Sequence, residues 1–199
     1  MNIYFDIETL PAAGKVLALV KSTYDNLILE NKINKISFEE FHKLTALNGD
    51  FGKIYCIAYA IDDNDVVVLT GDEKDILINF WEASKLVNLF IGHNIMEFDL
   101  PFIYKRSIIN NVKPSRNLMF ARYRIDPIYD TMKEWNKWST NNTSLDRLAK
   151  IFGIKSSKEI MKGSEVYNYY INNKHETVYR YCKEDVEVTR KIYKKLNFL

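Results

Sequence analysis

The chain has little cysteine, and it contains no long apolar run. Its two cysteines, Cys56 and Cys182, lack the spacing of a metal-binding pair, so we expect both to be reduced, partly buried thiols. No apolar run approaches the ~20 residues of a membrane-spanning helix, and no cleavage pattern of a signal peptide follows the N-terminus. These absences favour a soluble, cytoplasmic protein without a membrane partner.

Low-complexity segments and internal repeats are also missing, while 47% of the 199 residues are hydrophobic and 14% aromatic. This composition argues against disorder and predicts a single domain over residues 1–199. The net charge of +2 is small, but no acidic residue lies between Asp99 and Asp126. A basic stretch there would suit a polyanionic substrate, and an ordinary solvated surface explains it equally well. Its basic residues are Lys105, Arg106, Lys113, Arg116, Arg122 and Arg124.

Strand patterns come early in the chain, and helical patterns dominate later. Alternating or continuous apolar runs predict strands at residues 2–8, 54–61, 66–70, 89–91 and 124–129. Amphipathic spacing predicts helices at residues 74–86, 100–109, 144–152, 163–171 and 176–196, with a mostly helical insertion over 12–50. Turn residues 62–65 predict a hairpin, and Asn173 with Glu176 resembles a capping box. The order predicts an α/β fold in which helices flank a central mixed sheet.

The first strand carries two acids where a core strand should be apolar. Asp6 and Glu8 are two residues apart, so their side chains project from the same face. Two neighbouring carboxylates on a buried strand repel each other and lose hydration. A divalent cation would offset both costs, which predicts a metal site here.

A second motif follows the strand at 89–91. The loop contains Asn94, and Phe98 and Asp99 stand at the start of the next helix. An acid at a helix N-terminus is often only a cap. Taken alone, Asp99 is explained by capping.

The last helix carries a third motif. Tyr181 and Asp185 are four residues apart, so they share a face, and that face is otherwise apolar. A carboxylate in such a stripe needs a partner, which could be a metal or a buried basic side chain.

Taken in order, these motifs resemble the DEDD (DnaQ-like) superfamily of 3′–5′ exonucleases, in the subclass with tyrosine in the third motif (DEDDy). The histidine-type subclass would need histidine where Arg180 stands. The chain further resembles stand-alone predicted exonucleases related to the proofreading domain of family-B DNA polymerases. The residues that carry this likeness are Phe5-Asp6-Ile7-Glu8-Thr9-Leu10, Gly92-x-Asn94, Phe98-Asp99-x-Pro101, Asp130 before Met132, Gly163-Ser164-Glu165-Val166, and Tyr181-Cys182-Lys183-Glu184-Asp185-Val186 with Thr189.

The resemblance implies a ribonuclease H-like fold and a two-metal-ion site. Asp6, Glu8, Asp99 and Asp185 would bind two divalent cations, and all-carboxylate ligation suits Mg²⁺ or Mn²⁺. Tyr181 would hydrogen-bond the attacking water, because a phenol with a pKa of about 10 is a poor base at neutral pH. The products would be nucleoside 5′-monophosphates from 3′ ends of single-stranded DNA.

The resemblance also implies contacts with the terminal nucleotide from Thr9, Leu10, Asn94 and Phe98. Leu10 could instead belong to the core. RNA remains open as the substrate, and so does a catalytically silent nucleic-acid-binding domain. A catalytic role in proofreading would need a separate polymerase, or a repair factor, as partner.

Overall fold

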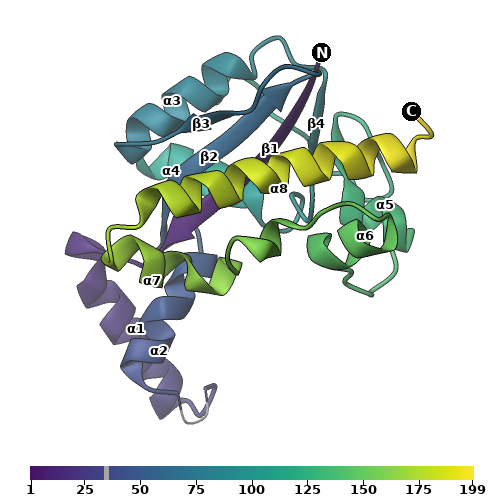
Figure 1. Cartoon of the computed structure of the whole chain (residues 1–199). Helices are drawn as coiled ribbons and strands as arrows, with labels where there is room; N and C mark the ends of the chain where they lie inside the picture. The colour runs from purple at the N-terminus through teal and green to yellow at the C-terminus, as the bar shows by residue number, and fades with distance from the viewer. Residues whose placement is uncertain (34–35) are drawn as a thin grey trace.

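A five-stranded mixed sheet lies at the centre of the computed structural model, which describes residues 1–33 and 36–199 (Figure 1). In chain order its strands are β1 (Asn2–Leu10), β2 (Lys53–Ile61), β3 (Val67–Leu69), β4 (Leu89–Gly92) and β5 (Ile128–Asp130). Their order across the sheet is β3-β2-β1-β4-β5. β1 pairs antiparallel with β2 and parallel with β4, so the strand that carries Asp6 and Glu8 is central.

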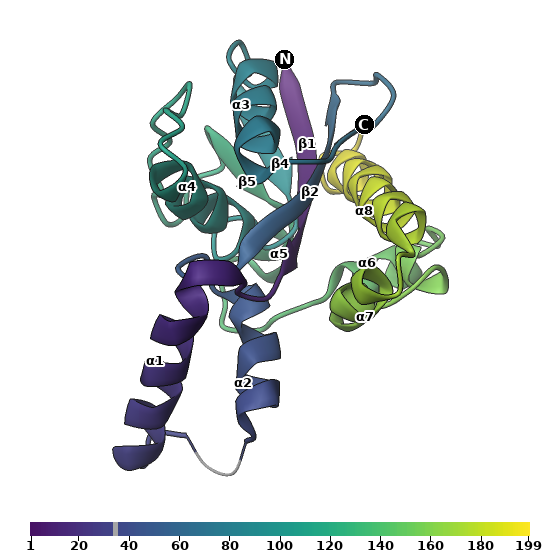
Figure 2. The same ribbon diagram turned by 90° about the vertical axis from the view of Figure 1, so that its left-hand side faces the viewer.

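Helices cover both faces of the sheet (Figure 2). The α-helices are α1 (Leu17–Leu29), α2 (Phe38–Leu44), α3 (Glu73–Ala83), α4 (Asp99–Ile109), α5 (Thr131–Asn136), α6 (Leu145–Ile151), α7 (Val166–Ile171) and α8 (His175–Leu196). Short 3-10 helices are η1 (Gly14–Val16), η2 (Thr45–Leu47), η3 (Ser157–Glu159) and η4 (Gly163–Glu165). α3 and α4 lie on one face, α8 crosses the other, and α1 and α2 extend beyond the end of β1. No helix within the described residues is long and apolar enough to cross a membrane.

The alternation of β1 divides its side chains between two cores. Ile3, Phe5 and Ile7 pack with the core beneath α3 and α4. Tyr4 packs on the other face, with residues of α8. Asp6 and Glu8 share that second face, so the fold turns both carboxylates toward α8.

Most of the expected elements are confirmed. The strands at 2–8, 54–61 and 89–91 form, and β2 and β3 pair antiparallel across the turn at 62–65. The strand expected at 124–129 is shorter and begins later, as β5 at Ile128, because only the residues from Ile128 onward pair with β4. The helix α5 that follows was not expected; Asp130 caps it by accepting hydrogen bonds from the Met132 and Lys133 N–H groups. The helix expected at 163–171 begins with the 3-10 turn η4.

The capping box expected at Asn173 is wrong. Lys174 is the N-cap of α8, and it makes no side-chain capping hydrogen bond. Asn173 adopts a left-handed φ of 55° and donates its N–H to the Tyr170 carbonyl, so it closes α7 instead. Asparagine tolerates this conformation, which is common just after a helix.

The insertion at 12–50 is mostly helical, as expected, through η1, α1, α2 and η2. Part of that prediction, residues 34 and 35, lies outside the described residues. A complete capping box starts α2, where the Ser37 hydroxyl accepts from the Glu40 N–H and the Glu40 carboxylate accepts from the Ser37 N–H.

Candidate active site

Three carboxylates from the two ends of the chain converge beside the central strand. Asp6 and Glu8 project from β1, and Asp185 reaches them from the middle of α8. One oxygen from each side chain lies within 4.8 Å of the other two. The structure therefore brings together three of the four acids that the sequence singled out.

Asp99 joins this cluster through the backbone of β1. Its Oδ1 accepts a hydrogen bond of 3.1 Å from the N–H of Ile7, the residue between Asp6 and Glu8. Phe98, not Asp99, is the N-cap of α4, and the Asp99 side chain is almost fully buried. The capping explanation is thus wrong, and Asp99 instead ties the start of α4 to β1, the strand that carries Asp6 and Glu8.

Burial and mutual repulsion make these carboxylates hard to ionise. Burial, and then the charges of Asp185, Asp99 and Glu8, raise the pKa of Asp6 well above its ordinary range. Burial raises the pKa of Glu8 in the same direction. It raises the pKa of Asp99 to about 7 and that of Asp185 to about 6. A cation held between the side chains would remove much of this cost.

The donor set fits a hard divalent cation. Asp6, Glu8 and Asp185 offer carboxylate oxygens alone, and oxygen ligands suit Mg²⁺ or Mn²⁺. Several buried acids without a neutralising charge are costly in a folded protein. The residues present therefore fit a divalent metal.

Tyr181 stands one helical turn from Asp185 on the same face of α8. Its side chain is largely buried, and burial together with the Asp185 charge raises the pKa of the phenol above its ordinary value. The phenol therefore keeps its proton at neutral pH. A Cβ built on Gly163, at the start of η4, would lie 3.7 Å from the Tyr181 hydroxyl, an ordinary van der Waals contact, so η4 packs beside the phenol.

Ser157 is a residue of the site that sequence reasoning missed. Its hydroxyl, in η3, donates a hydrogen bond of 2.5 Å to the Asp185 Oδ1, and the pair is buried. This bond lowers the pKa of Asp185, in opposition to burial. Ser157 therefore orients Asp185. No spacing rule links the two residues, which are 28 positions apart.

The two cysteines are free and buried, as expected. Cys56 stands opposite Glu8 in the β1–β2 register. The Cys182 thiol lies 3.6 Å from Oδ2 of Asp6, as a weak donor. Burial raises the pKa of the Cys182 thiol, so it stays protonated beside the acids.

Asp130 organises the loop of the second motif. Its carboxylate accepts hydrogen bonds from the N–H groups of Asn94 and Met96, at 3.0 and 3.1 Å. Asn94 has a left-handed φ of 63°, which asparagine tolerates. His93 bonds Thr131 and the Thr143 carbonyl through its two ring nitrogens, and burial lowers its pKa to about 4. His93 is therefore a neutral structural side chain.

Thr9 and Leu10, at the end of β1, are both buried. The β1 register shifts between Glu8 and Thr9, and the Thr9 hydroxyl donates to the Ala46 carbonyl at 2.6 Å. Leu10 is only 1% exposed and packs in a cluster with Tyr181 and Val178. Leu10 thus belongs to the core, the alternative that its sequence position left open. Contacts of Thr9 and Leu10 with a terminal nucleotide stay a prediction.

The basic stretch is partly neutralised. Arg106 forms a two-pronged ion pair with Glu73, with N–O distances of 2.9 and 2.8 Å. Lys105 pairs with Asp50 at 2.8 Å. The start of the stretch is therefore an ordinary paired surface, while Arg122 and Arg124 lie exposed further on.

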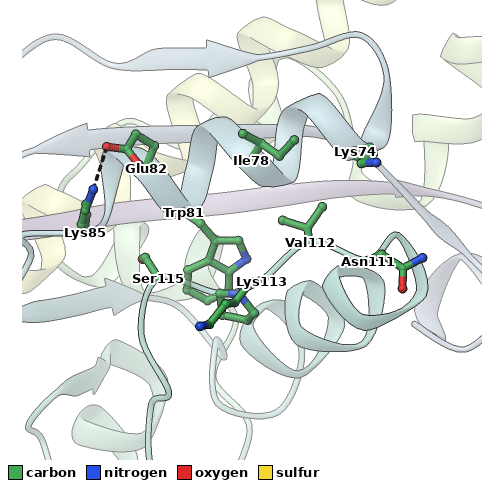
Figure 3. A pocket seen from close by; sticks show the side chains of 10 residues that line it. Lys74, Ile78, Trp81, Glu82, Lys85, Asn111, Val112, Lys113 and Ser115 are labelled. Carbon is green, nitrogen blue, oxygen red and sulfur yellow. Dashed lines mark hydrogen bonds and ion pairs between the residues drawn. The ribbon is translucent and has the colours of Figure 1, made fainter.

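A cavity lies between α3 and the segment that follows α4, and none of the four acids lines it. It has a volume of about 430 Å³, with Trp81, Lys74, Lys85 and Lys113 in its lining (Figure 3). Lys74 stands in the first turn of α3 and Lys85 follows its last turn, so the length of the helix separates them. Their charges do not converge on one anion, and this cavity brings no carboxylate cluster.

Comparison with known proteins places the chain in a family. A family described as predicted 3′–5′ exonucleases related to the exonuclease domain of PolB matches residues 54–199. The matched part holds Asp99, Tyr181 and Asp185, while Asp6 and Glu8 precede it.

Two relatives are similar over most of the chain. A DNA polymerase of Archaeoglobus fulgidus is 25% identical over 158 residues, which is 72% of this chain and 20% of the polymerase. An uncharacterized protein of Methanocaldococcus jannaschii is 25% identical over 161 residues, covering 75% of this chain and 89% of that protein. The chain thus spans about a fifth of the first relative and most of the second.

The family B DNA polymerase of Pyrobaculum calidifontis has a similar fold. The TM-score is 0.69 at 18% identity, and the match covers 98% of this chain and 24% of the polymerase. This likeness confirms the ribonuclease H-like α/β fold. With the family match over most of its length, the chain belongs to the predicted 3′–5′ exonucleases related to the exonuclease domain of PolB.

Proposed function

We propose that this chain is a metal-dependent 3′–5′ exonuclease of the DEDDy subclass, with residues 1–199 as one domain. It would release nucleoside 5′-monophosphates from the 3′ ends of single-stranded DNA. The convergence of Asp6, Glu8 and Asp185 within 4.8 Å carries this proposal. The substrate would be a 3′ end left by a separate polymerase or repair factor in the cytoplasm.

The four acids would divide the binding of two divalent cations, Mg²⁺ or Mn²⁺. When bound, such ions stabilise charge on the phosphate and leaving oxygen and lower the pKa of the attacking water. Asp6 would serve both ions, since its charge interacts with Asp185, Asp99 and Glu8. Glu8 and Asp185 would complete the binding site of the cation that holds the attacking water. Asp99, whose carboxylate accepts from the Ile7 N–H, would bind the second cation through water.

Tyr181 would orient the attacking water through a hydrogen bond from or to its hydroxyl. It would not be the base, because burial and Asp185 raise its pKa. Asn94 and Phe98 would contact the sugar and base of the terminal nucleotide.

The Tyr181→Phe variant is therefore expected to lower kcat about 10- to 100-fold, since one hydrogen bond in the transition state is worth roughly 1.5–3 kcal/mol. KM should change little. Steady-state kinetics on a single-stranded DNA would measure both constants. Tyr179→Phe, on the same helix and stacked on Tyr55, is the matched control and should retain full activity. An unchanged kcat for Tyr181→Phe would contradict the assignment.

The reaction itself is tested with 5′-labelled single-stranded DNA and RNA of matching sequence. The protein would be incubated with each in Mg²⁺, in Mn²⁺ and in EDTA, and the products resolved by length. We expect a ladder that shortens from the 3′ end of the DNA and disappears in EDTA. A ladder from RNA alone would reassign the substrate. Binding without cleavage in either metal would indicate a silent nucleic-acid-binding domain.

A further inference from the structure

A cavity with a volume of about 390 Å³ lies between α5, α6 and the connection that joins them. This volume falls within the range of small-molecule binding sites, roughly 300–1,000 Å³. Unlike the cluster on β1 and α8, the lining contains no acidic side chain. It consists of Trp135 and Asn136 of α5, Asn141, Asn142 and Thr143 of the connection, and Arg147 and Ile151 of α6.

Hydrogen bonds fix the wall that the connection forms. The Thr143 hydroxyl donates to Oδ1 of Asn136 at 3.0 Å, and the Asn136 amide donates to the Met132 carbonyl at 3.0 Å. The Thr143 carbonyl accepts from Nε2 of His93 at 2.9 Å. This wall is therefore held before any ligand arrives, which lowers the cost of ordering it on binding.

Trp135 gives the cavity an aromatic surface. Its ring packs against Phe152 in an edge-to-face contact, with centroids 5.4 Å apart and planes at 83°. This contact holds the orientation of the indole, yet Trp135 remains 37% exposed. A nucleobase can stack on such a ring, because every base has a π-face. Ile151, which is also exposed, adds apolar surface that a bound base would cover.

Arg147 gives the cavity a positive charge that no neighbour neutralises. Its neighbour along the chain, Asp146, pairs instead with Lys150 at 3.0 Å, and within the described residues Arg147 has no ion pair. The Arg147 side chain is half-buried, so its charge is partly shielded from water. A guanidinium group donates two parallel hydrogen bonds to a phosphate. The cavity therefore favours an anionic ligand such as a phosphate ester.

The cavity lies close to the candidate active site and shares no residue with it. Both α5 and α6 pack against α8, the helix that carries Asp185. Asp146 accepts a hydrogen bond of 2.7 Å from the Ser156 hydroxyl, and the next residue, Ser157, donates to Asp185. A ligand held by Arg147 would thus lie beside the carboxylate cluster without occupying it.

We propose that this cavity is a second nucleotide-binding site, in which a base stacks on Trp135 and a phosphate pairs with Arg147. Asn141 and Asn142 have amides that can donate to and accept from the edge of the base. The ligand is a nucleotide, either a free nucleoside 5′-monophosphate or one unit of a longer strand. Binding there needs neither a metal ion nor cleavage, so the site goes beyond the proposed function and is tested separately from it.

Isothermal titration calorimetry of the protein in EDTA, with dAMP and with deoxyadenosine, tests the two contacts. The wild type should bind dAMP about tenfold more tightly, since only dAMP has a phosphate for Arg147. Arg147→Ala should abolish this difference and leave the Kd of deoxyadenosine unchanged. Trp135→Leu should weaken both ligands about tenfold, because they share the base. Arg122→Ala is the matched control, since Arg122 is an exposed arginine outside the cavity, and it should change neither Kd.

A 5′-fluorescent single-stranded DNA 12-mer, titrated in the same buffer and followed by anisotropy, distinguishes the two sources of the nucleotide. If Arg147→Ala weakens dAMP binding alone, the ligand is a free nucleotide. If it weakens binding of the 12-mer, with or without dAMP, the site also takes a strand.

Three results would overturn the proposal: no binding of any probe, wild-type affinities in Arg147→Ala or Trp135→Leu, or equal losses in Arg147→Ala and Arg122→Ala. A protein that gives one of these results and still cleaves DNA keeps its proposed function. Nucleotide binding through Arg147 in a protein that never cleaves would overturn the proposed function alone.

Discussion

The Asp6→Ala variant is expected to lose about 10³-fold or more in kcat, because Asp6 would contact both metal ions. The chain should remain folded. Burial and three neighbouring acids raise the pKa of Asp6, so its charge opposes folding in the absence of metal. Steady-state cleavage of labelled single-stranded DNA in Mn²⁺ measures the loss, and circular dichroism checks the fold.

Asp65→Ala is the control for removing an acid, since Asp65 is exposed near the β2–β3 turn. It should cleave at the wild-type rate. If Asp6→Ala kept its activity, the carboxylate cluster would not be the catalytic site. If the wild-type protein were equally inactive, the site would be catalytically silent, and only the assignment of the fold would stand.

The main features of the site could be predicted from short-range patterns. The two-residue spacing of Asp6 and Glu8 sets them on one face of a strand, and the four-residue spacing of Tyr181 and Asp185 sets them on one face of a helix. Both faces are otherwise apolar, so each acid stands out against its neighbours. These periods are fixed by backbone geometry and need no knowledge of the tertiary fold.

Other features depend on contacts between distant segments, which a single sequence does not reveal. Ser157 reaches Asp185 from a separate 3-10 turn, and only packing brings them together. The sequence left Leu10 open as a nucleotide contact or a core residue, and only the packing of Tyr181 against it shows that it lies in the core. Asn173 was expected to start α8, yet the same residue closes α7, because asparagine suits either position.

The metal-free protein is expected to lose stability as the pH rises from about 5 to about 8. The pKa of Asp185 is raised to about 6 and that of Asp99 to about 7, from an ordinary value of 3.8. The native state therefore holds protons that the unfolded chain has released, and this contribution is lost as the pH passes through the raised values. We expect Tm in EDTA to fall by roughly 5–10 °C over this interval.

The Asp99→Asn variant should flatten this dependence and raise the metal-free Tm at pH 8. Its side-chain oxygen can still accept from the Ile7 N–H, so the change removes a charge while keeping the hydrogen bond. Asp65→Asn, at an exposed position, should leave the curve unchanged. Mn²⁺ should raise the wild-type Tm most at pH 8, where the acids must ionise to bind it. A wild-type Tm in EDTA that rose steadily toward pH 8 would contradict this account. The acids would then have to be paired or solvated, and the physical reason for placing a cation among them would disappear.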